Sequence, residues 1–411
     1  VAGASLAIIN AAGSTSNSPT TSLEGFSDGE IAGVPISLVS VGCGDETPDK
    51  AVAEIRRIVE QDGANVVIGP LSGDEGIAVA NYAKDHPEVT FINGISGGQD
   101  ATLHVQAPNF FRYNNDGAQW NAGIGDILYN EAGWRTAAVI MDDYSFGWTS
   151  AAGFIADFCG VGGEVVSRVY APLGTTDYSS FIQQLPDPDE VDGYFWVVGG
   201  SGTVPAMNAF IDAKGDFNGT QHSANLFWGP GLAADFGTDI AGAYIGGFAT
   251  PPADIVGTPV LDEYLASADA AWESLSDGAP SASAATGFFY GFYAGSLAFT
   301  TAFEQVGGDL SDNHAALREA LSNLELDAPY GPVVLDENRQ AVTDTWVQQL
   351  VESDGELGAQ TVAIIPDVDQ TFGGTFSADT PPPGRGEPEC VTADLPWAGN
   401  AIPVVDGVAQ E

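Results

Sequence analysis

Three consecutive residues, Ser72-Gly73-Asp74, have the chemistry of a turn that binds an anion or a carbonyl oxygen. They follow an apolar run at 66–70 and precede a predicted helix in the stretch VVIGPLSGDEG. Backbone N–H groups at a helix N-terminus attract negative charge, and a serine hydroxyl adds a donor. A phosphate loop would need a Lys-Ser/Thr pair, and Asp74 with Glu75 would repel phosphate. Nucleotide binding is therefore not expected here, and a tight strand-to-helix turn is the simpler alternative.

The usual catalytic signatures do not support an enzyme. No G-x-G-x-x-G opens a helix after a first strand, and GGSGTVPA at 199–206 is only a distant relative. We expect neither an H-E-x-x-H motif nor a G-x-S-x-G elbow, and pairs such as Asp142-Asp143 are expected by chance among 56 acidic residues. The histidines are scattered, and we expect each in a polar surface setting: His86, His104, His222 and His314. The sequence thus predicts no catalytic residues, no metal site and no cofactor.

The charge balance restricts the partners. The chain has 56 acidic and 11 basic side chains and a formal net charge of -45. Nucleic acid and anionic membrane surfaces need basic patches, so neither is expected as a partner. Such a surface repels itself in dilute buffer, so a saline, halophilic habitat is one explanation of the acidity and simple solubility is the other.

Length and cysteine content bound the architecture. A chain of 411 residues with 44% hydrophobic residues predicts a folded protein of two lobes or domains. No apolar stretch reaches the roughly 18 residues that cross a bilayer, and no basic-then-apolar leader opens the chain. We therefore expect a soluble molecule whose export signal was removed or lies outside this sequence. Cys43, Cys159 and Cys390 match no zinc or redox spacing, which predicts one disulfide and one buried thiol.

Strand-like and helix-like segments alternate along most of the chain. Residues 1–13 and 49–63 have helical apolar spacing, whereas 34–41 is typical of a strand. Further strands are expected at 64–70, 89–94, 136–143, 163–172, 192–200 and 224–230, and further helices at 75–85, 144–158, 178–185, 203–214 and 287–308. This alternation predicts an α/β protein with parallel sheets in two doubly wound lobes. The tail from 366 has no periodicity and is interpreted as an extended strap.

Turns of small residues follow several of the predicted strands. They lie at 72–74, 94–97, 142–148, 199–202 and 229–231. In open parallel sheets, ligands bind at the carboxyl ends of the strands. Two lobes whose ligand-binding edges face each other would clamp a small molecule.

An ordered set of segments resembles the extracytoplasmic solute-binding proteins of ABC importers, in the leucine/isoleucine/valine-binding (type I periplasmic-binding) family. The similarity covers roughly residues 1–350. Its segments are AVAEIRRIVEQDGANVVIGPLSG (51–73), FFRYNNDGAQ (110–119), AAVIMDDYSFG (137–147), GTTDYSSFIQQL (174–185), WVVGGSG (196–202) and YGPVVLDENRQAV (330–342).

The resemblance implies two Rossmann-like lobes joined by three crossovers. We expect the crossovers near 113–117, 247–251 and 328–332. Lobe 1 would comprise 1–114 and 250–328, lobe 2 would comprise 115–249 and 329–365, and a Pro-rich extension tied down by Cys390 would occupy 366–411.

The resemblance also implies the ligand-binding residues. In the family, the turn after Gly-Pro grips the α-carboxylate of the ligand and a second turn adds a hydroxyl. Aromatic residues cover the ligand, and an aspartate lies near its amine. A stacking wall of tryptophan is a further option. The implied positions here are Ser72, Gly73, Asp74, Ser96, Gly97, Asp116, Phe146, Ser201, Gly202, Trp228 and Tyr293.

Two departures from the family leave the ligand open. Gly73 stands in place of a second serine, and Gly231 stands where an acidic residue pairs with the ligand ammonium. A buried, unpaired ammonium would be costly. Amides, ureas, small peptides and aromatic or hydroxylated acids are therefore candidates beside amino acids.

A third departure concerns the N-terminal strand. Family members begin with a strand before the first helix, whereas this chain begins in that helix. We expect either a truncated sequence or another segment, such as 401–405, in the central strand slot. Cys43 also lacks the family's disulfide partner near Ser72.

The predicted function is capture of a small polar organic solute for an ABC permease by an extracytoplasmic, monomeric protein, with lipid anchoring as one option. A doubly wound enzyme, either a dehydrogenase or an amidohydrolase, is the first alternative. A ligand-sensing ectodomain on the same fold is the second.

Overall fold

The computed structural model describes residues 2–13, 29–225, 228–247, 259–273 and 287–410, and the chain forms two compact units. Unit 1 comprises Val1–Asn115 and Val256–Thr343, and unit 2 comprises Asp116–Ile255 and Asp344–Glu411. The crossover expected at 247–251 lies outside the described residues from 248 onward. The lobe boundaries given above stay predictions.

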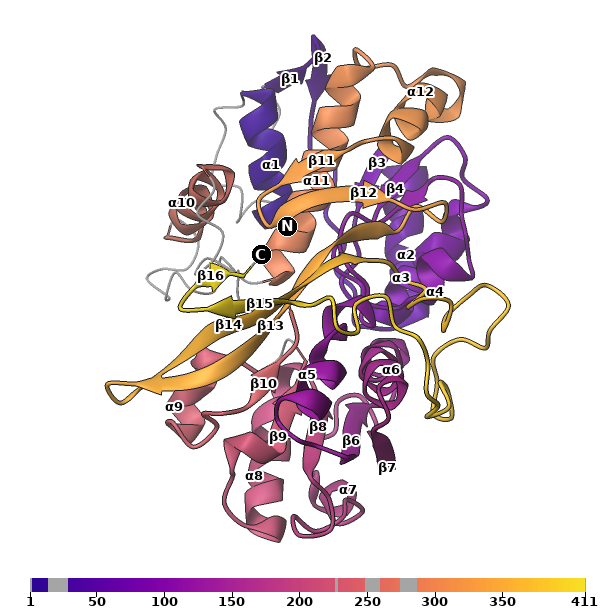
Figure 1. Cartoon of the computed structure of the whole chain (residues 1–411). Helices are drawn as coiled ribbons and strands as arrows, with labels where there is room; N and C mark the ends of the chain where they lie inside the picture. The colour runs from indigo at the N-terminus through magenta and orange to yellow at the C-terminus, as the bar shows by residue number, and fades with distance from the viewer. Residues whose placement is uncertain (1, 14–28, 226–227, 248–258, 274–286, 411) are drawn as a thin grey trace. The chain divides into compact units, whose positions relative to one another are not determined.

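Unit 1 combines a short parallel sheet with helices on both faces (Figure 1). Its helices are α1 (Ala2–Ala12), α2 (Pro48–Arg56), α3 (Gly73–Ala83), α4 (Asp100–Leu103), α10 (Pro259–Glu273), α11 (Gly287–Gln305) and α12 (Ser311–Ser322). Its strands are β1 (Gly29–Ile31), β2 (Val34–Ile36), β3 (Val66–Ile68), β4 (Thr90–Ile92), β5 (Phe110–Phe111), β11 (Leu326–Ala328) and β12 (Gly331–Leu335). The helix expected at 49–63 is α2, extended by a π-helical turn over Arg57–Gln61.

The sheet of unit 1 has the order β3-β4-β5 with all strands parallel. Because successive side chains of a strand point to opposite faces, each face has its own core. Phe91 of β4 packs with Val79 of α3 on one face, whereas Ile92 packs with Phe299 and Phe303 of α11 on the other. The long apolar helix expected at 287–308 is therefore a core helix.

The strand expected at 34–41 forms only in part. β2 ends at Ile36 and pairs antiparallel with β1, and residues 37–45 form no strand. The prediction is thus wrong over 37–41. A strand needs a neighbour that accepts its backbone hydrogen bonds, and β-propensity alone does not supply one.

Unit 2 has a larger mixed sheet. Its strands are β6 (Thr136–Asp142), β7 (Glu164–Ala171), β8 (Gly193–Val197), β9 (His222–Ala224), β10 (Tyr244–Ile245), β14 (Glu356–Val368), β15 (Ile402–Val405) and β16 (Val408–Ala409). Its helices are α5 (Ile124–Asn130), α6 (Ser145–Gly160), α7 (Ser179–Ile182), α8 (Thr203–Lys214) and α9 (Ala233–Phe236). The strand β13 (Ala341–Ser353) begins in unit 1 and continues in unit 2. The sheet order in unit 2 is β16-β15-β14-β13-β10-β9-β8-β6-β7, and β7, β6, β8, β9 and β10 run parallel.

The C-terminal region is more ordered than the expected strap. β14 continues to Val368, and the segment 401–405 forms β15 on the edge of β14, with Ile364 opposite Ile402. This segment therefore belongs to the sheet of unit 2, and the expectation that it supplies a strand to another slot is wrong.

Between β14 and β15 the chain runs as a strap over 369–400 that is fixed to α6 and β7. Cys390 forms a disulfide with Cys159 of α6, as expected for a residue that ties the strap down. Trp397 donates from Nε1 to Asp157 Oδ1 at 2.7 Å, and Arg168 of β7 donates to the Pro388 carbonyl at 2.7 Å. The remaining cysteine, Cys43, is exposed, so the expected buried thiol is wrong.

Candidate functional site

The turn after β3 has a buried hydroxyl at the start of a helix. Ser72 is the N-cap of α3 and is 2% exposed. Its Oγ faces the Glu75 N–H in the capping box of α3, and its own hydroxyl proton has no acceptor among the described residues. Its backbone N–H donates to Glu75 Oε2 at 3.4 Å, which closes the first turn of α3. Asp74 lies half-buried in the same turn. A capping hydroxyl can accept from a helix N–H and still donate its own proton to an oxygen atom of a ligand.

The turn after β4 places a second serine nearby. Ser96 is fully buried, and its Oγ donates to Asn93 Oδ1 at 2.5 Å. The lone pairs of this hydroxyl remain able to accept. Asn114 donates from Nδ2 to the Gly94 carbonyl at 2.6 Å and thereby fixes the turn. Gly97 is buried in the same turn.

The two turns of unit 1 are packed against each other. The Ile95 N–H donates to the Pro70 carbonyl at 3.1 Å. A Cβ added at Gly76 would collide with Ser96 Oγ, and one added at Gly98 would lie 3.0 Å from the Gly73 carbonyl oxygen. The structure therefore brings Ser72, Gly73, Asp74, Ser96 and Gly97 into one cluster.

The pentapeptide Gly94–Gly98 matches G-x-S-x-G, so the expected absence of this pattern is wrong. A nucleophile elbow needs a helix directly after the serine and a histidine as its base. Here α4 begins only at Asp100, and the Ser96 hydroxyl donates to an asparagine. The geometry matches a packed turn and not a hydrolase elbow.

α11 presents a different aromatic residue to these turns than the one predicted. Tyr293 packs against Tyr264 of α10 with ring centroids 4.8 Å apart, and burial raises the pKa of Tyr293. Phe292 instead lies over the turn, because a Cβ added at Gly94 would collide with its ring. Adjacent helical residues point about 100° apart. The sequence FFYGFYAG has aromatic residues on several sides, so it gave no means of choosing between the two.

In unit 2, Asp116 caps a short helical turn. It is buried, and its Oδ1 accepts the N–H groups of Ala118 at 2.9 Å and Gln119 at 3.0 Å. The Asp116 N–H donates in turn to Gln119 Oε1 at 2.9 Å. These contacts hold the Asp116 carboxylate in one orientation, in which its Oδ1 caps the backbone of the helical turn.

Two strand-end turns of unit 2 are joined by a buried carboxylate. Asp142, at the end of β6, accepts the Gly199 N–H at 2.9 Å. Phe146 lies in the first turn of α6, and the centroid of its ring is 6.0 Å from that of Trp120. Gly202 is buried under Tyr178, because a Cβ there would collide with the Tyr178 hydroxyl, whereas Ser201 is exposed.

Trp228 lies in the core of unit 2 and not on an open wall. It is 1% exposed, and its ring lies 5.8 Å from Trp196 and 5.9 Å from His222. His222 is buried as well, its Nδ1 accepts from Trp196 Nε1 at 3.0 Å, and burial lowers its pKa to about 3. The predicted surface setting of His222 is therefore wrong, since aromatic neighbours exclude water around it. The same prediction is wrong for His314, which is 3% exposed and lies 3.0 Å from Thr90 Oγ1 through its Nδ1. The packing assigns Trp228 to the core as well.

The turn after β6 carries a contact that no sequence pattern predicts. Arg385 of the strap forms an ion pair with Asp143, with Nε 2.9 Å from Oδ1. Trp148 donates from Nε1 to the same oxygen at 3.1 Å, and the hydrogen bonds from Arg385 and Trp148 lower the pKa of Asp143. Because the partners are 242 residues apart, no local pattern could have revealed this pair.

Neither a metal cluster nor a membrane-spanning helix occurs within the described ranges. No group of three His, Cys, Asp or Glu side chains there is placed to hold a metal ion. No helix in those ranges is long and apolar enough to cross a bilayer.

Comparisons with known proteins point to one family. A family model described as "Periplasmic binding protein" matches residues 2–356. The Leu/Ile/Val-binding protein homolog 6 of Brucella melitensis is 24% identical over 187 residues, which are 46% of this chain and 45% of that protein. The chain thus matches less than half the length of this curated relative.

Solved structures share the fold. An ABC transporter substrate-binding protein from Sphaerobacter thermophilus has a TM-score of 0.72 at 22% identity and covers 89% of this chain and 92% of its own. A solute binding protein of an ABC transporter from R. palustris, in complex with benzoate, has a TM-score of 0.67 at 20% identity, with 83% and 89% covered. A leucine binding protein from Thermotoga maritima has a TM-score of 0.64 at 17% identity, with 82% and 89% covered. The type I periplasmic-binding fold predicted from the sequence is confirmed.

Proposed function

Because the chain belongs to the periplasmic binding protein family, we propose that it captures a small organic solute outside the cytoplasm and delivers it to an ABC permease. The observation that carries this proposal is the buried Ser72 hydroxyl at the N-terminus of α3, whose proton has no acceptor among the described residues. Buried polar groups are nearly always hydrogen-bonded, so such a donor is most useful to a bound molecule.

The chemistry of the Ser72 turn favours an oxygen-bearing head group. The hydroxyl and the first N–H groups of α3 all donate, which suits a carboxylate or a carbonyl oxygen. Asp74 and Glu75 in the same turn oppose a highly charged anion such as phosphate. Structures with this fold were determined with benzoate and with 4-hydroxybenzoate, and a third is a leucine binding protein. We therefore favour a small monocarboxylate, aromatic or aliphatic, as the ligand.

Unit 2 offers the complementary groups in this proposal. Phe146 would supply an apolar surface to the body of the ligand, and Ser201 would supply a hydroxyl from the turn after β8. Gly202 would shape that turn, because its N–H donates to the Gly199 carbonyl at 3.0 Å. The Asp116 carboxylate would interact with the ligand in one fixed orientation, because its Oδ1 already accepts two backbone N–H groups. Trp228 and Tyr293 take a packing role in this account and no direct role in binding.

A thermal-shift screen tests the proposal. A ligand at about a hundredfold excess over its Kd stabilises the folded state by about 2.7 kcal/mol. We expect a raised melting temperature with at least one of benzoate, 4-hydroxybenzoate and leucine, at both low and high salt. Absence of any shift across a wider panel of small solutes, combined with catalytic turnover of one of them, would contradict a binding role.

Three separate measurements test the oligomeric state, a lipid anchor and the dependence of stability on salt. We expect a monomer, which sedimentation would show as a single species of about the chain mass of 42.4 kDa. Mass spectrometry of the protein from its native membrane fraction would reveal an attached lipid if the protein is anchored. A folded state that gains stability steadily with added salt would support a saline habitat, because salt screens the repulsion among 56 acidic side chains.

A further inference from the structure

The strand order of unit 2 reverses at β6. β7 lies on one side of β6 and β8 on the other, and all three strands are parallel. In open parallel sheets, ligands bind outside the carboxyl ends of the strands at such a point. The Gly199 N–H, after β8, donates to the carboxylate of Asp142 at the end of β6 at 2.9 Å. The unit 2 side of the proposed solute site is therefore expected beside this buried carboxylate.

A second carboxylate follows directly in the chain. The side chain of Asp143 is 10% exposed, and the Asp143 N–H donates to the Ala171 carbonyl at the end of β7 at 2.8 Å. Phe146, which is proposed to contact the solute, lies in the same turn at the start of α6. Like charges repel more strongly where water is scarce. Two negative charges at this turn would therefore oppose the carboxylate ligand proposed above.

Arg385 of the strap brings a positive charge to this turn. Its Nε lies 2.9 Å from Asp143 Oδ1, and its Nη2 donates to Asp143 Oδ2, so the guanidinium contacts both carboxylate oxygens. The other basic residues of unit 2 donate to backbone carbonyls outside this turn, and they are Arg135, Arg168 and Lys214. Arg385 thus offsets the charge of Asp143 at the edge where the solute is proposed to bind.

The strap holds Arg385 in this place. Gly384 and Glu387 exchange two backbone hydrogen bonds of 3.3 Å, which puts Arg385 at the tip of a closed turn. Tyr170 of β7 donates to the Arg385 carbonyl, and the guanidinium lies 5.5 Å from the centroid of the Tyr170 ring. Five residues further along, the disulfide ties the strap to α6. Arg385 is therefore fixed against its partner although its side chain is 66% exposed.

We propose that Arg385 sets the charge specificity of the solute site, because it cancels the charge of Asp143 beside Phe146 and so permits a carboxylate to bind. This inference rests on the proposed function, since it concerns the unit 2 side of the same site. Arg385 acts through Asp143 and not by contact with the ligand. An electrostatic role affects charged ligands and fades as salt screens it, whereas a role in shaping the turn affects charged and neutral ligands alike.

Calorimetry with matched acid and amide probes tests this role. The probes are benzoate and 4-hydroxybenzoate, each compared with its uncharged amide. Arg385→Gln leaves the Asp143 charge without its cation. At about 0.1 M salt it should weaken binding of the acid by about threefold to tenfold and change binding of the amide by less than about twofold. The loss should shrink at about 1 M salt, where the Debye length is about 3 Å.

Two further variants separate charge from shape. Asp143→Asn combined with Arg385→Gln removes both charges and should regain the affinity of the unaltered chain for the acid within about twofold. Arg135→Gln is the matched control, because it removes one positive charge at the opposite end of β6. That strand has seven residues and spans about 23 Å, more than twice the Debye length at 0.1 M salt, so acid binding should change by less than about twofold. Circular dichroism at both salt concentrations checks that each variant folds.

The outcomes distinguish this inference from the proposed function. Acid binding that Arg385→Gln leaves unchanged would overturn the inference and leave the proposed function intact. Equal weakening of acid and amide at both salt concentrations, or no recovery in the double variant, would also overturn it. If the amides bind too weakly to measure, the double variant and the salt dependence decide. A chain that binds neither acid would overturn it as well, and the thermal-shift panel then shows whether the proposed function stands.

Discussion

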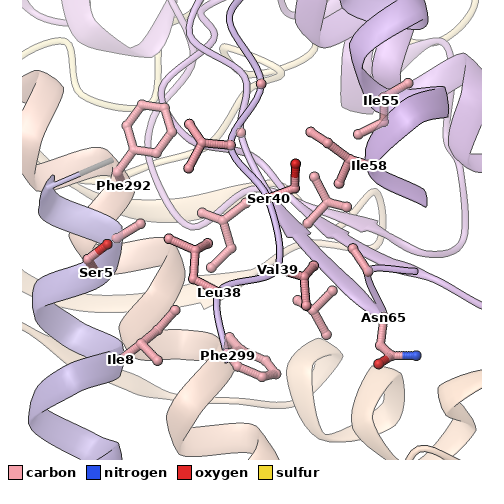
Figure 2. Close-up of a pocket in the computed structure, with 18 of the residues that line it drawn as sticks. Ser5, Ile8, Leu38, Val39, Ser40, Ile55, Ile58, Asn65, Phe292 and Phe299 are labelled. Atoms are coloured by element: carbon pink, nitrogen blue, oxygen red, sulfur yellow. The ribbon is translucent and has the colours of Figure 1, made fainter. Parts of the chain in front are cut away.

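The two edge strands β3 and β7 differ in what covers their outer edges within the described residues. β7 of unit 2 is covered by the strap: Arg168 donates to the Pro388 carbonyl, Tyr170 donates to the Arg385 carbonyl, and the disulfide fixes Cys390 next to Val165. In the described part of unit 1, β3 pairs with β4 alone, and its other edge lies beside an apolar cavity (Figure 2). Edge strands invite further pairing unless they are covered. Unit 2 thus covers the edge of its sheet with its own C-terminal region, whereas β3 of unit 1 has no such cover in the ranges that the structure describes.

The largest expected effect comes from removing the Cys159–Cys390 disulfide, which should lower the stability of the chain and uncover the edge of β7. Cys159 and Cys390 are 231 residues apart, and closing so long a loop in the unfolded chain is worth about 5 kcal/mol in the chain-entropy model. We expect Cys159→Ala with Cys390→Ala to lower the free energy of unfolding by several kcal/mol and to expose β7 to hydrogen exchange. Cys43→Ala is the matched control, since Cys43 is a free, exposed cysteine. Unchanged exchange in β7 would show that the strap does not protect this edge.

Asp157 gives a pH-dependent test of the same strap. Burial raises the pKa of Asp157 to about 7, although Trp397 and Gly125 donate to it. The unfolded chain loses this proton near pH 4 while the folded chain retains it. The contribution to stability is therefore greatest below about pH 4 and falls by up to about 4 kcal/mol as the pH rises to 7.

Asp157→Asn should remove this pH dependence of the free energy of unfolding. Urea unfolding at intervals from pH 4.5 to 7.5 gives the difference between variant and unaltered chain, in which the titration of the other acidic residues cancels. We expect the unaltered chain to lose stability relative to the variant as the pH rises. A difference that does not change with pH would show that Asp157 ionises as readily in the folded as in the unfolded state.

A matched pair of conservative substitutions should give the smallest effect. Ile140 is fully buried in β6, which has strands on both sides, whereas Ile68 of β3 is half-buried at the edge beside the cavity. Ile→Val in a core costs about 0.5–1.5 kcal/mol. We expect Ile140→Val to lie in this range and Ile68→Val to cost less than half as much, as measured by urea unfolding. Equal costs would mean that the β3 edge is packed as closely as a central strand.

The fold could be predicted from the sequence where successive segments of the chain have clear strand and helix patterns. The alternation of apolar runs and amphipathic helices gave the parallel strands β3, β4, β6, β7 and β8, and the Gly-Pro-Leu-Ser turn gave the N-terminus of α3. The strand at 37–41 failed because pairing depends on a partner that no local pattern contains. The long hairpin β13–β14 was missed although its turn, Asp354-Gly355, is a strong hairpin signal between alternating residues.

The candidate site was predictable only in part. Ser72 and Ser96 could be selected because each follows a strand in a turn of small residues, and the structure brings them together. The choice between Phe292 and Tyr293 depends on helix rotation, and the burial of Trp228 depends on tertiary packing with Trp196 and His222. Neither is encoded in the residue types.

The most direct test of the central claim is a calorimetric titration of the unaltered chain and Ser72→Ala with benzoate, 4-hydroxybenzoate and leucine. We expect one of these carboxylates to bind with one molecule per chain. Loss of a hydrogen bond to a charged group costs about 1.5–3 kcal/mol, so Ser72→Ala should weaken that binding by at least about tenfold. Ser180→Ala, which removes an exposed hydroxyl on α7, should leave it unchanged. Equal affinity of Ser72→Ala and the unaltered chain for the bound carboxylate would contradict the account.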